Sequence, residues 1–259
     1  MLLTGRTLAF DTSSRATSAA LLKGAQVVAE QRHSPEAAGS SRLLVPTVQQ
    51  LLLQQGWRFQ ALQQLVVTVG PGSFSGLRMG LVTAKLLAYA NQLPIAGLNT
   101  LQVLAFRASQ PQPTRARQRM IALLDAQRGE LFAQPFLLDD SGTPYPEAPR
   151  EILAAKDLAT RFPEGLFTGS GLRSFAKAIA STPNGRPIGN DADVSNLPAE
   201  IAARATSAEL WDCTAAAAGQ LAVQLGPTLP IFDCWNLLPD YGRPSAAEEK
   251  AIDRSRPSV

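Results

Sequence analysis

The chain has 259 residues, of which 45% are hydrophobic and 17% are charged, and its formal net charge is +3. This balance excludes a disordered or collagen-like chain, and the length suits one large or two small folded domains. Arginine outnumbers lysine 19 to 5, which permits a nucleic-acid partner without demonstrating one.

The expected compartment follows from what the sequence lacks. Cys213 and Cys234 are too few for a disulfide framework and have no CxxC spacing, so we expect two reduced thiols. The first ten residues lack the apolar segment of a signal peptide, and no apolar run reaches the roughly 20 residues that span a bilayer. We therefore expect a cytoplasmic protein with no membrane partner.

The first 110 residues alternate between strand and helix patterns. Apolar runs predict a meander of three antiparallel strands over residues 7–11, 16–22 and 25–31. Helical spacing predicts helices over residues 40–55, 75–90 and 100–108, with strands over 65–69 and 94–98 between them. We expect residues 1–110 to form one lobe.

A second lobe is expected after residues 110–118, a stretch rich in proline and arginine that is the best linker candidate. The sequence then predicts strands over residues 120–124, 130–138 and 166–168, and helices over 154–161, 172–180 and 212–225. We expect residues 111–243 to form this lobe, with the helix near 212–225 completing the first lobe. Residues 244–259 are expected to be a disordered tail.

Two polar turns follow apolar strands, at Asp11-Thr12-Ser13-Ser14 and at Asp125. In kinases and ATPases of the actin and hexokinase architecture, a turn at this position binds phosphate and its aspartate organises a metal. The same residue types also cap turns by bonding to backbone amides. Taken alone, the turn favours the structural interpretation.

A glycine-rich loop joins the strand at 65–69 to the helix that follows. Its spacing fits neither a Walker A nor a Rossmann fingerprint, because Leu77 and Arg78 follow Gly76 where Walker A needs Lys and Ser or Thr. We expect a tight connection with a structural or partner-binding role, capped by one of its serines. The loop consists of Gly70, Pro71, Gly72, Ser73, Phe74, Ser75 and Gly76.

Candidate catalytic residues are scarce. The sole histidine, His33, belongs to no HxxxH or HExxH motif, and no GxSxG elbow supplies a nucleophile for a triad. We therefore expect no catalytic, cofactor-binding or metal-binding residue. Arg115, Arg117 and Arg119 alternate, so in an extended segment they would share one face, as an RNA contact or as a solvated linker.

Four segments together point to a known family. Residues 65–80, LVVTVGPGSFSGLRMG, closely resemble the GPGSFTGLRIG hallmark of the TsaB (YeaZ) family, with Ser75 replacing threonine and Met79 replacing isoleucine. The opening LAFDTSSRATSAALL, the later LLDAQRGELFA and the late LPDYGRP resemble further family segments in the same order. These stretches are distributed along most of residues 7–243.

The resemblance implies an α/β fold of two actin-like (ASKHA, RNase H-like) lobes, each a mixed sheet flanked by helices. It also implies a role in threonylcarbamoylation of the adenosine next to the anticodon in tRNAs that read codons beginning with A. A TsaD-type transferase performs that reaction, a TsaE-type ATPase joins the assembly, and the TsaB-type subunit forms a heterodimer with the transferase. This subunit reaches tRNA through the complex.

The catalytic relative carries two metal-binding histidines on its first helix, whereas residues 33–53 here offer only His33. A noncatalytic scaffold is therefore expected. We predict that two adjacent helices bind the transferase, or a second copy of the chain when the transferase is absent. The predicted interface residues are Leu44, Val48, Leu51 and Leu52 on the first helix and Leu77, Arg78, Leu81 and Lys85 on the second.

Two other functions stay open at this point. An ATP-dependent phosphotransferase of the same fold would use Asp11 and Asp125 around a metal nucleotide, with Gly169-Ser170-Gly171 near the base. A stand-alone RNA-binding module would show a tRNA affinity that falls steeply with salt in the absence of any partner.

Overall fold

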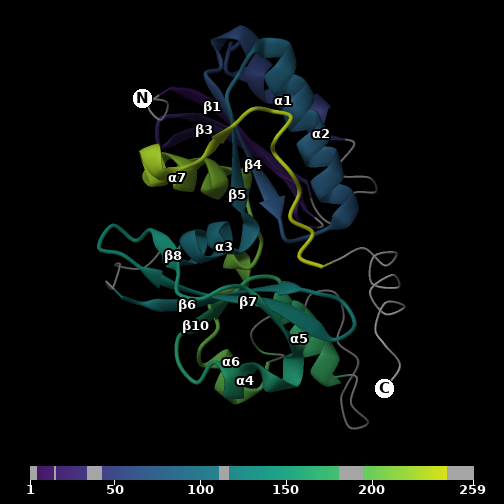
Figure 1. The fold of residues 1–259 in the computed structure, drawn as a ribbon, viewed down its shortest axis with the longest axis vertical. Helices are drawn as coiled ribbons and strands as arrows, with labels where there is room; N and C mark the ends of the chain where they lie inside the picture. The colour runs from purple at the N-terminus through teal and green to yellow at the C-terminus, as the bar shows by residue number, and fades with distance from the viewer. Residues whose placement is uncertain are drawn as a thin grey trace, which may run out of the picture.

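The computed structural model describes residues 5–14, 16–33, 43–110, 117–180, 195 and 197–243. The predicted tail at 244–259, the first residues of the helix predicted from residue 40, and Arg115 lie outside these residues. Two mixed sheets flanked by helices form the two-lobed α/β architecture that was expected (Figure 1).

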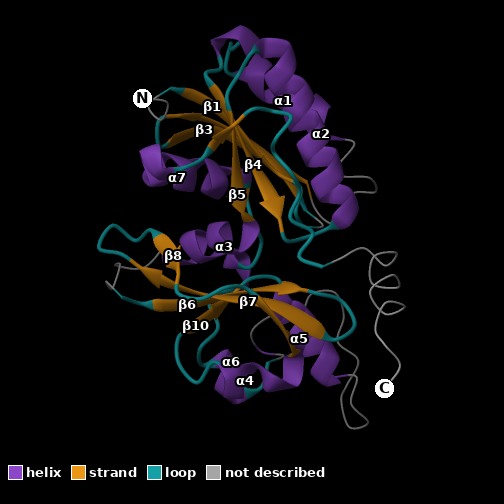
Figure 2. Ribbon diagram, viewed as in Figure 1, coloured by secondary structure: helices purple, strands orange, loops and turns teal. Residues whose placement is uncertain are grey.

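The first sheet has six strands in the order β11-β5-β4-β1-β2-β3. Figure 2 shows the strands of both sheets in orange. The predicted meander is confirmed, because β1 pairs antiparallel with β2 and β2 with β3, whereas β4 and β5 run parallel to β1. The strands are β1 (Arg6–Asp11), β2 (Thr17–Lys23), β3 (Gln26–His33), β4 (Gln64–Gly70), β5 (Ile95–Asn99) and β11 (Ile231–Phe232).

The second sheet repeats the opening arrangement in shorter form, with the order β10-β6-β7-β8 and β9 also paired to β7. Its strands are β6 (Arg119–Asp125), β7 (Glu130–Leu138), β8 (Pro144–Pro146), β9 (Glu151–Ala154) and β10 (Leu166–Thr168). The helical segment predicted over 154–161 is confirmed from Ala155, as a 3-10 turn over Ala155–Asp157 that leads into an α-helix. Ala154 pairs with Glu130 at the end of β9, and only Leu158–Arg161, labelled α4, is α-helical.

The helices fall into three layers around the two sheets (Figure 1). The outer face of the first sheet is covered by α1 (Leu44–Gln54) and α2 (Phe74–Asn91). Between the sheets lie α3 (Thr100–Ser109) and α7 (Ala215–Leu225), and α4, α5 (Gly171–Ala180) and α6 (Ala199–Ala202) lie on the far side of the second sheet. Among the described residues, no helix combines the length and hydrophobicity that crossing a bilayer requires.

The alternation along β1 and β2 explains the layers on both faces of the first sheet. Leu8 and Leu21 are register partners that pack under α1, whereas Ala9 and Ala20 are partners on the opposite face, under α7. Successive side chains in a strand point to opposite faces, so each strand serves two cores. Small side chains on the second face allow α7 to approach closely.

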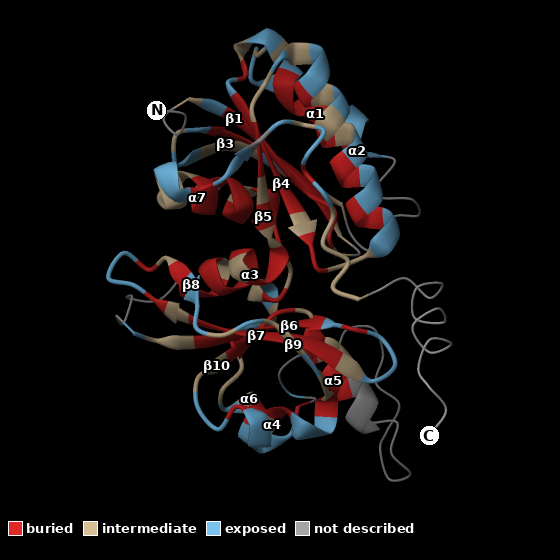
Figure 3. Cartoon of the chain, in the orientation of Figure 1, coloured by how far each residue is buried: buried red, intermediate tan, exposed pale blue. Residues whose placement is uncertain are grey.

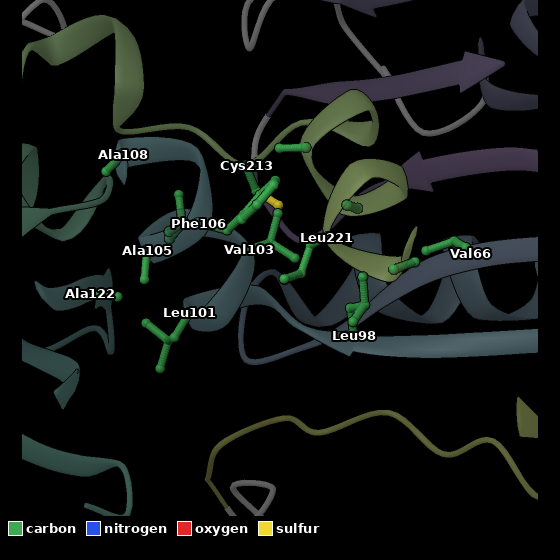
Figure 4. Close-up of a cluster of buried hydrophobic side chains, with 14 of the residues drawn as sticks. Val66, Leu98, Leu101, Val103, Ala105, Phe106, Ala108, Ala122, Cys213 and Leu221 are labelled. Atoms are coloured by element: carbon green, nitrogen blue, oxygen red, sulfur yellow. The ribbon is translucent and has the colours of Figure 1, made fainter. Parts of the chain in front are cut away.

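One hydrophobic core is continuous through both lobes. It joins Val66 and Leu98 of the first sheet to Ala122 of the second through the side chains of α3 and α7 (Figure 4). Eight of the ten residues of α3 are buried, as expected for a helix enclosed between two sheets. Its first turn is capped by Asn99, whose side chain accepts hydrogen bonds from the backbone N–H groups of Leu101 and Gln102.

Residues 233–243, which we call the C-terminal strap, connect the lobes a second time. The backbone N–H of Asp240 donates to the carbonyl of Val69 in the first lobe at 2.7 Å, and its carboxylate accepts two bonds from Arg150 of the second lobe at 2.5 and 3.1 Å. Arg243 pairs with Glu130 at the start of β7. The strap therefore holds both lobes through polar contacts.

The shared core predicts that the lobes unfold together. Phe106 of α3 is 2% exposed, and Phe106→Ala should lower the free energy of unfolding by about 3–5 kcal/mol. Urea denaturation monitored by single-tryptophan variants that keep Trp57 or Trp211 should give one coincident transition for the two lobes. Leu238→Ala, at a position 70% exposed, should change stability by less than about 0.5 kcal/mol. Two separate transitions would contradict a shared core.

Candidate functional site

The glycine-rich loop and the Asp11-Thr12-Ser13 turn lie against each other at one end of the first sheet. The backbone N–H of Ser73 donates to the carbonyl of Ser13 at 2.6 Å. The hydroxyl of Ser73 in turn accepts from the N–H of Gly76 and caps α2, as predicted. The two motifs found separately in the sequence thus form one structural unit.

Three glycines spaced four residues apart make this contact possible. A Cβ on Gly72 would lie 2.2 Å from the carbonyl oxygen of Ser13, and a Cβ on Gly76 would lie 2.0 Å from that of Thr12. A Cβ on Gly80 would lie 2.1 Å from the Thr12 hydroxyl. Because α2 rests directly on the turn, a phosphate group could enter between them only if the helix moved away.

Asp11 is buried beneath this contact and organises the turn. Its Oδ1 accepts hydrogen bonds from the Ser13 hydroxyl at 2.5 Å, the Ser13 N–H at 3.1 Å and the Thr68 hydroxyl at 2.5 Å. Burial raises the pKa of the carboxyl group, and the hydrogen bonds only partly oppose that effect. The neighbouring Cys213 thiol is also buried, and its pKa lies well above the usual value because of burial and the adjacent Asp11.

The turn at Asp125 and the Gly169-Ser170-Gly171 segment also make internal contacts. The exposed Asp125 accepts a hydrogen bond from the backbone N–H of Gln127 at 2.7 Å, as in an ordinary turn. A Cβ on Gly169 would lie 2.2 Å from the carbonyl oxygen of Leu123, so this segment packs on β6. The residues named for a phosphotransferase therefore each make contacts that stabilise the fold.

The predicted interface residues are mostly core residues, which corrects their assignment. The apolar ones, Leu44, Val48, Leu51, Leu52, Leu77 and Leu81, are between 0 and 3% exposed. All but Leu77 belong to the core on the outer face of the first sheet, and all six are too buried to meet a partner. Arg78 is exposed and stacks on Phe74 at 5.3 Å, and Lys85 is half-buried with its ammonium 3.5 Å from the Trp235 carbonyl.

The apolar stripe of α2 that is exposed differs from the predicted one. Val82 and Leu86 each lie one residue after a predicted position, Leu81 and Lys85. Figure 3 shows that the side of α2 turned away from the sheet is exposed. We call this surface the outer face of α2; it comprises Met79, Val82, Leu86 and Tyr89, which are 43–64% exposed. Trp235 of the strap contacts it through Tyr89 and is 60% exposed, and Leu238, also of the strap, is 70% exposed. The apolar residues of α2 nearly surround the helix, so periodicity could not tell which stripe faces the sheet.

Aromatic contacts join the strap to both ends of the outer face of α2. The ring centroids of Phe74 and Tyr241 are 4.5 Å apart, and those of Tyr89 and Trp235 are 5.5 Å apart. These contacts leave the four aromatic residues partly accessible. A partner would therefore meet α2 and the strap as one apolar surface.

The remaining candidates have structural partners. His33 ends β3 and lies 2.6 Å from the Thr47 hydroxyl, and Arg119 pairs with Glu147 at 2.6 Å. Two arginines that the sequence did not single out are also bonded: Arg173 pairs with Asp212, and Arg204 donates to two backbone carbonyls. In the part of the chain that the structure describes, no three His, Cys, Asp or Glu side chains group as metal ligands.

Comparison with known proteins identifies related sequences. A family model described as TsaD, tRNA N6-adenosine threonylcarbamoyltransferase, matches residues 26–218. The tRNA threonylcarbamoyladenosine biosynthesis protein TsaB of Escherichia coli K12 is 31% identical over 148 residues, 57% of this chain and 62% of that protein. Its namesake from Bacillus subtilis is 34% identical over 126 residues, 48% and 52% of the two chains. The chain therefore spans 52–62% of the length of these curated relatives.

Solved structures extend the comparison to the whole fold. YeaZ from Pseudomonas aeruginosa superposes with a TM-score of 0.69 at 24% identity, covering 92% of this chain and 99% of that one. At this identity the likeness shows a shared fold.

The glycine contact predicts a specific loss of stability. Gly76→Ala would force a methyl group against the Thr12 carbonyl and should destabilise the chain by about 1–3 kcal/mol in urea denaturation. Ser75→Ala, one residue earlier at an exposed position of the same helix, is the matched control and should have little effect. Equal stability of the two variants would refute close packing as the reason for this glycine.

Buried Asp11 predicts a pH dependence. Because its pKa is raised in the folded state, the folded chain binds more protons than the unfolded chain above about pH 4, and stability falls as pH rises through the raised pKa. Asp11→Asn removes this titration but keeps a carbonyl oxygen to accept the three hydrogen bonds. The Tm of the variant should therefore rise, relative to that of the original chain, as the pH is raised above about 4. A relative fall above that pH would show the opposite sign of the pKa shift.

Proposed function

This chain belongs to the family of TsaB (YeaZ) proteins, and from that premise we propose that it is the partner subunit of a TsaD-type transferase. In this role it supports threonylcarbamoylation of the adenosine next to the anticodon in tRNAs that read codons beginning with A. It acts in the cytoplasm as a scaffold and leaves the transfer reaction to the transferase.

The observation that carries this proposal is the outer face of α2. Four apolar side chains on one helical stripe and two more on the strap are 43–70% exposed. Contiguous apolar surface of this kind commonly marks a protein interface, and aromatic residues are enriched at the centre of such interfaces. On α1, Val45 and Leu53 are also exposed apolar residues, at 42% and 82%.

The contact between the glycine loop and the Asp11 turn supports a noncatalytic role. The backbone N–H of Ser73 already donates to the carbonyl of Ser13, so it is not free to donate to a nucleotide phosphate. Asp11 is buried, and its raised pKa disfavours the charged form that a metal ion would need. The phosphotransferase alternative is not favoured for the same reasons.

The same face would serve more than one assembly. In the absence of the transferase, a second copy of the chain is the available cover for an exposed apolar stripe, so we expect a homodimer in isolation. The TsaE-type ATPase would join after the heterodimer has formed, and tRNA would be reached through the complex.

Co-elution of the chain with its own TsaD-type transferase tests the proposal. Val82→Glu or Leu86→Glu would place an uncompensated carboxylate at the centre of the interface and should weaken association by roughly 3 kcal/mol, more than a hundredfold in Kd. Both positions are more than half exposed, so these variants should keep the original melting transition.

Two control variants distinguish loss of the interface from loss of the folded core. Thr160→Glu adds the same charge at an exposed position on the second lobe and should leave binding unchanged. Val48→Glu, at a fully buried position, should instead lose the melting transition. Normal co-elution of Val82→Glu and Leu86→Glu would exclude this face, and failure of the original chain to co-elute would exclude the partner role.

A further inference from the structure

Charge is distributed unevenly between the two halves of the chain. Residues 1–110 contain nine Lys and Arg but only three Asp and Glu, and no acidic residue occurs between Glu36 and Asp125. The remainder, residues 111–259, contains 15 Lys and Arg and 18 Asp and Glu. The first lobe is therefore the basic part of a nearly neutral chain.

Some of these cations gather at the end of the first sheet where β1 begins. Arg6 and Lys23 are register partners on β1 and β2, and both are exposed. The guanidinium of Arg6 lies over the Trp57 ring at 4.7 Å, and the exposed Arg58 follows in the chain. We call this group, Arg6, Lys23, Trp57 and Arg58, the basic tip.

The basic tip has an arrangement that the fold itself does not require. Like charges directly opposite each other on paired strands are destabilising unless a counter-charge is present. A helix C-terminus such as that of α1 attracts cations. Here, however, the last carbonyls of α1, those of Leu51, Leu52 and Leu53, already accept backbone N–H groups, so no side chain is needed to bond them.

Acidic side chains within the described residues lie elsewhere. Glu30 accepts a hydrogen bond from the N–H of Ala216, on the opposite face of the sheet. Asp233 follows β11, which is three strands away from β1. The polar residues next to the tip are uncharged glutamines, among them Gln63, whose side chain accepts from the Arg6 N–H. Within the described residues, therefore, no carboxylate is shown to pair with the basic tip, which leaves its charges open to an anionic ligand.

We propose that the basic tip binds the phosphate backbone of RNA. Guanidinium groups suit phosphate oxygens, and the Trp57 ring holds the Arg6 guanidinium in place by a cation–π contact. Backbone contacts of this type position an RNA without reading its sequence. The choice of tRNA as the RNA rests on the proposed function. None of the residues of the tip belongs to the outer face of α2.

The test is the salt dependence of tRNA affinity. An unmodified tRNA transcript is titrated, at several salt concentrations, into the chain alone and into its complex with the TsaD-type transferase. Arg6→Gln combined with Arg58→Gln removes two phosphate contacts and should reduce the slope of log K against log salt by about 1.5. Lys156→Gln combined with Arg161→Gln makes the same change of net charge on the second lobe and should leave the slope unchanged.

Other outcomes of the tRNA titration would overturn the proposal. Equal slopes for the two double variants, or no tRNA binding by the chain or its complex at low salt, would overturn the proposal. Loss of co-elution with the transferase at an unchanged slope would mean that the tip binds an acidic protein, and would also overturn it. Failure of the original chain to bind the transferase would refute the proposed function, while the titration with the chain alone would still test the tip.

A check on folding accompanies this test. The double variant should retain a melting transition because Arg6 and Arg58 are exposed. Lys23→Gln relieves the like-charge pair, so it should raise the Tm of the free chain at low salt and still weaken tRNA binding. A lower Tm together with unchanged tRNA affinity would show that Lys23 has a structural role, against the proposal.

Discussion

The enclosure of α3 and α7 between two sheets is the interaction on which the rest of the structure depends. Each lobe alone would expose one face of its sheet, and the shared core buries both faces against the same two helices. Burial of this kind is the dominant favourable contribution to folding. The lobes therefore have a fixed relation to each other, and the strap adds the Arg150–Asp240 and Arg243–Glu130 pairs to that relation.

A fixed relation between the lobes suits a scaffold. Closure of two lobes around a nucleotide needs room for a phosphate between the turn after β1 and helix α2. Here Gly72, Gly76 and Gly80 allow α2 to pack directly on that turn. The same packing buries one side of α2 against the sheet and leaves the outer face of α2 exposed. The glycine motif thus links two properties, the close packing of α2 on the Asp11 turn and the exposed apolar stripe of the same helix.

Arginine has two different uses in the chain. In the second lobe and the strap, Arg150, Arg173 and Arg243 pair with carboxylates. In the first lobe, where acids are few, Arg6, Arg58 and Arg78 are exposed, and Arg6 and Arg78 lie over aromatic rings. Ion pairs within the chain neutralise the first group, whereas no ion pair within the described residues neutralises the second.

The sequence by itself determined the α/β class, the meander of β1 to β3, the repeated strand-Asp-turn unit, the capped α2 and the family, because these features depend on local periodicity, turn chemistry and motif spacing. Only the tertiary structure decided which stripe of α2 is exposed, since Leu81 and Val82 are equally apolar and only contact with the sheet distinguishes them. It also decided the pairing of β11, which has two residues, and the approach of α2 to the Asp11 turn. These features depend on contacts between residues far apart in the chain, which no local pattern encodes.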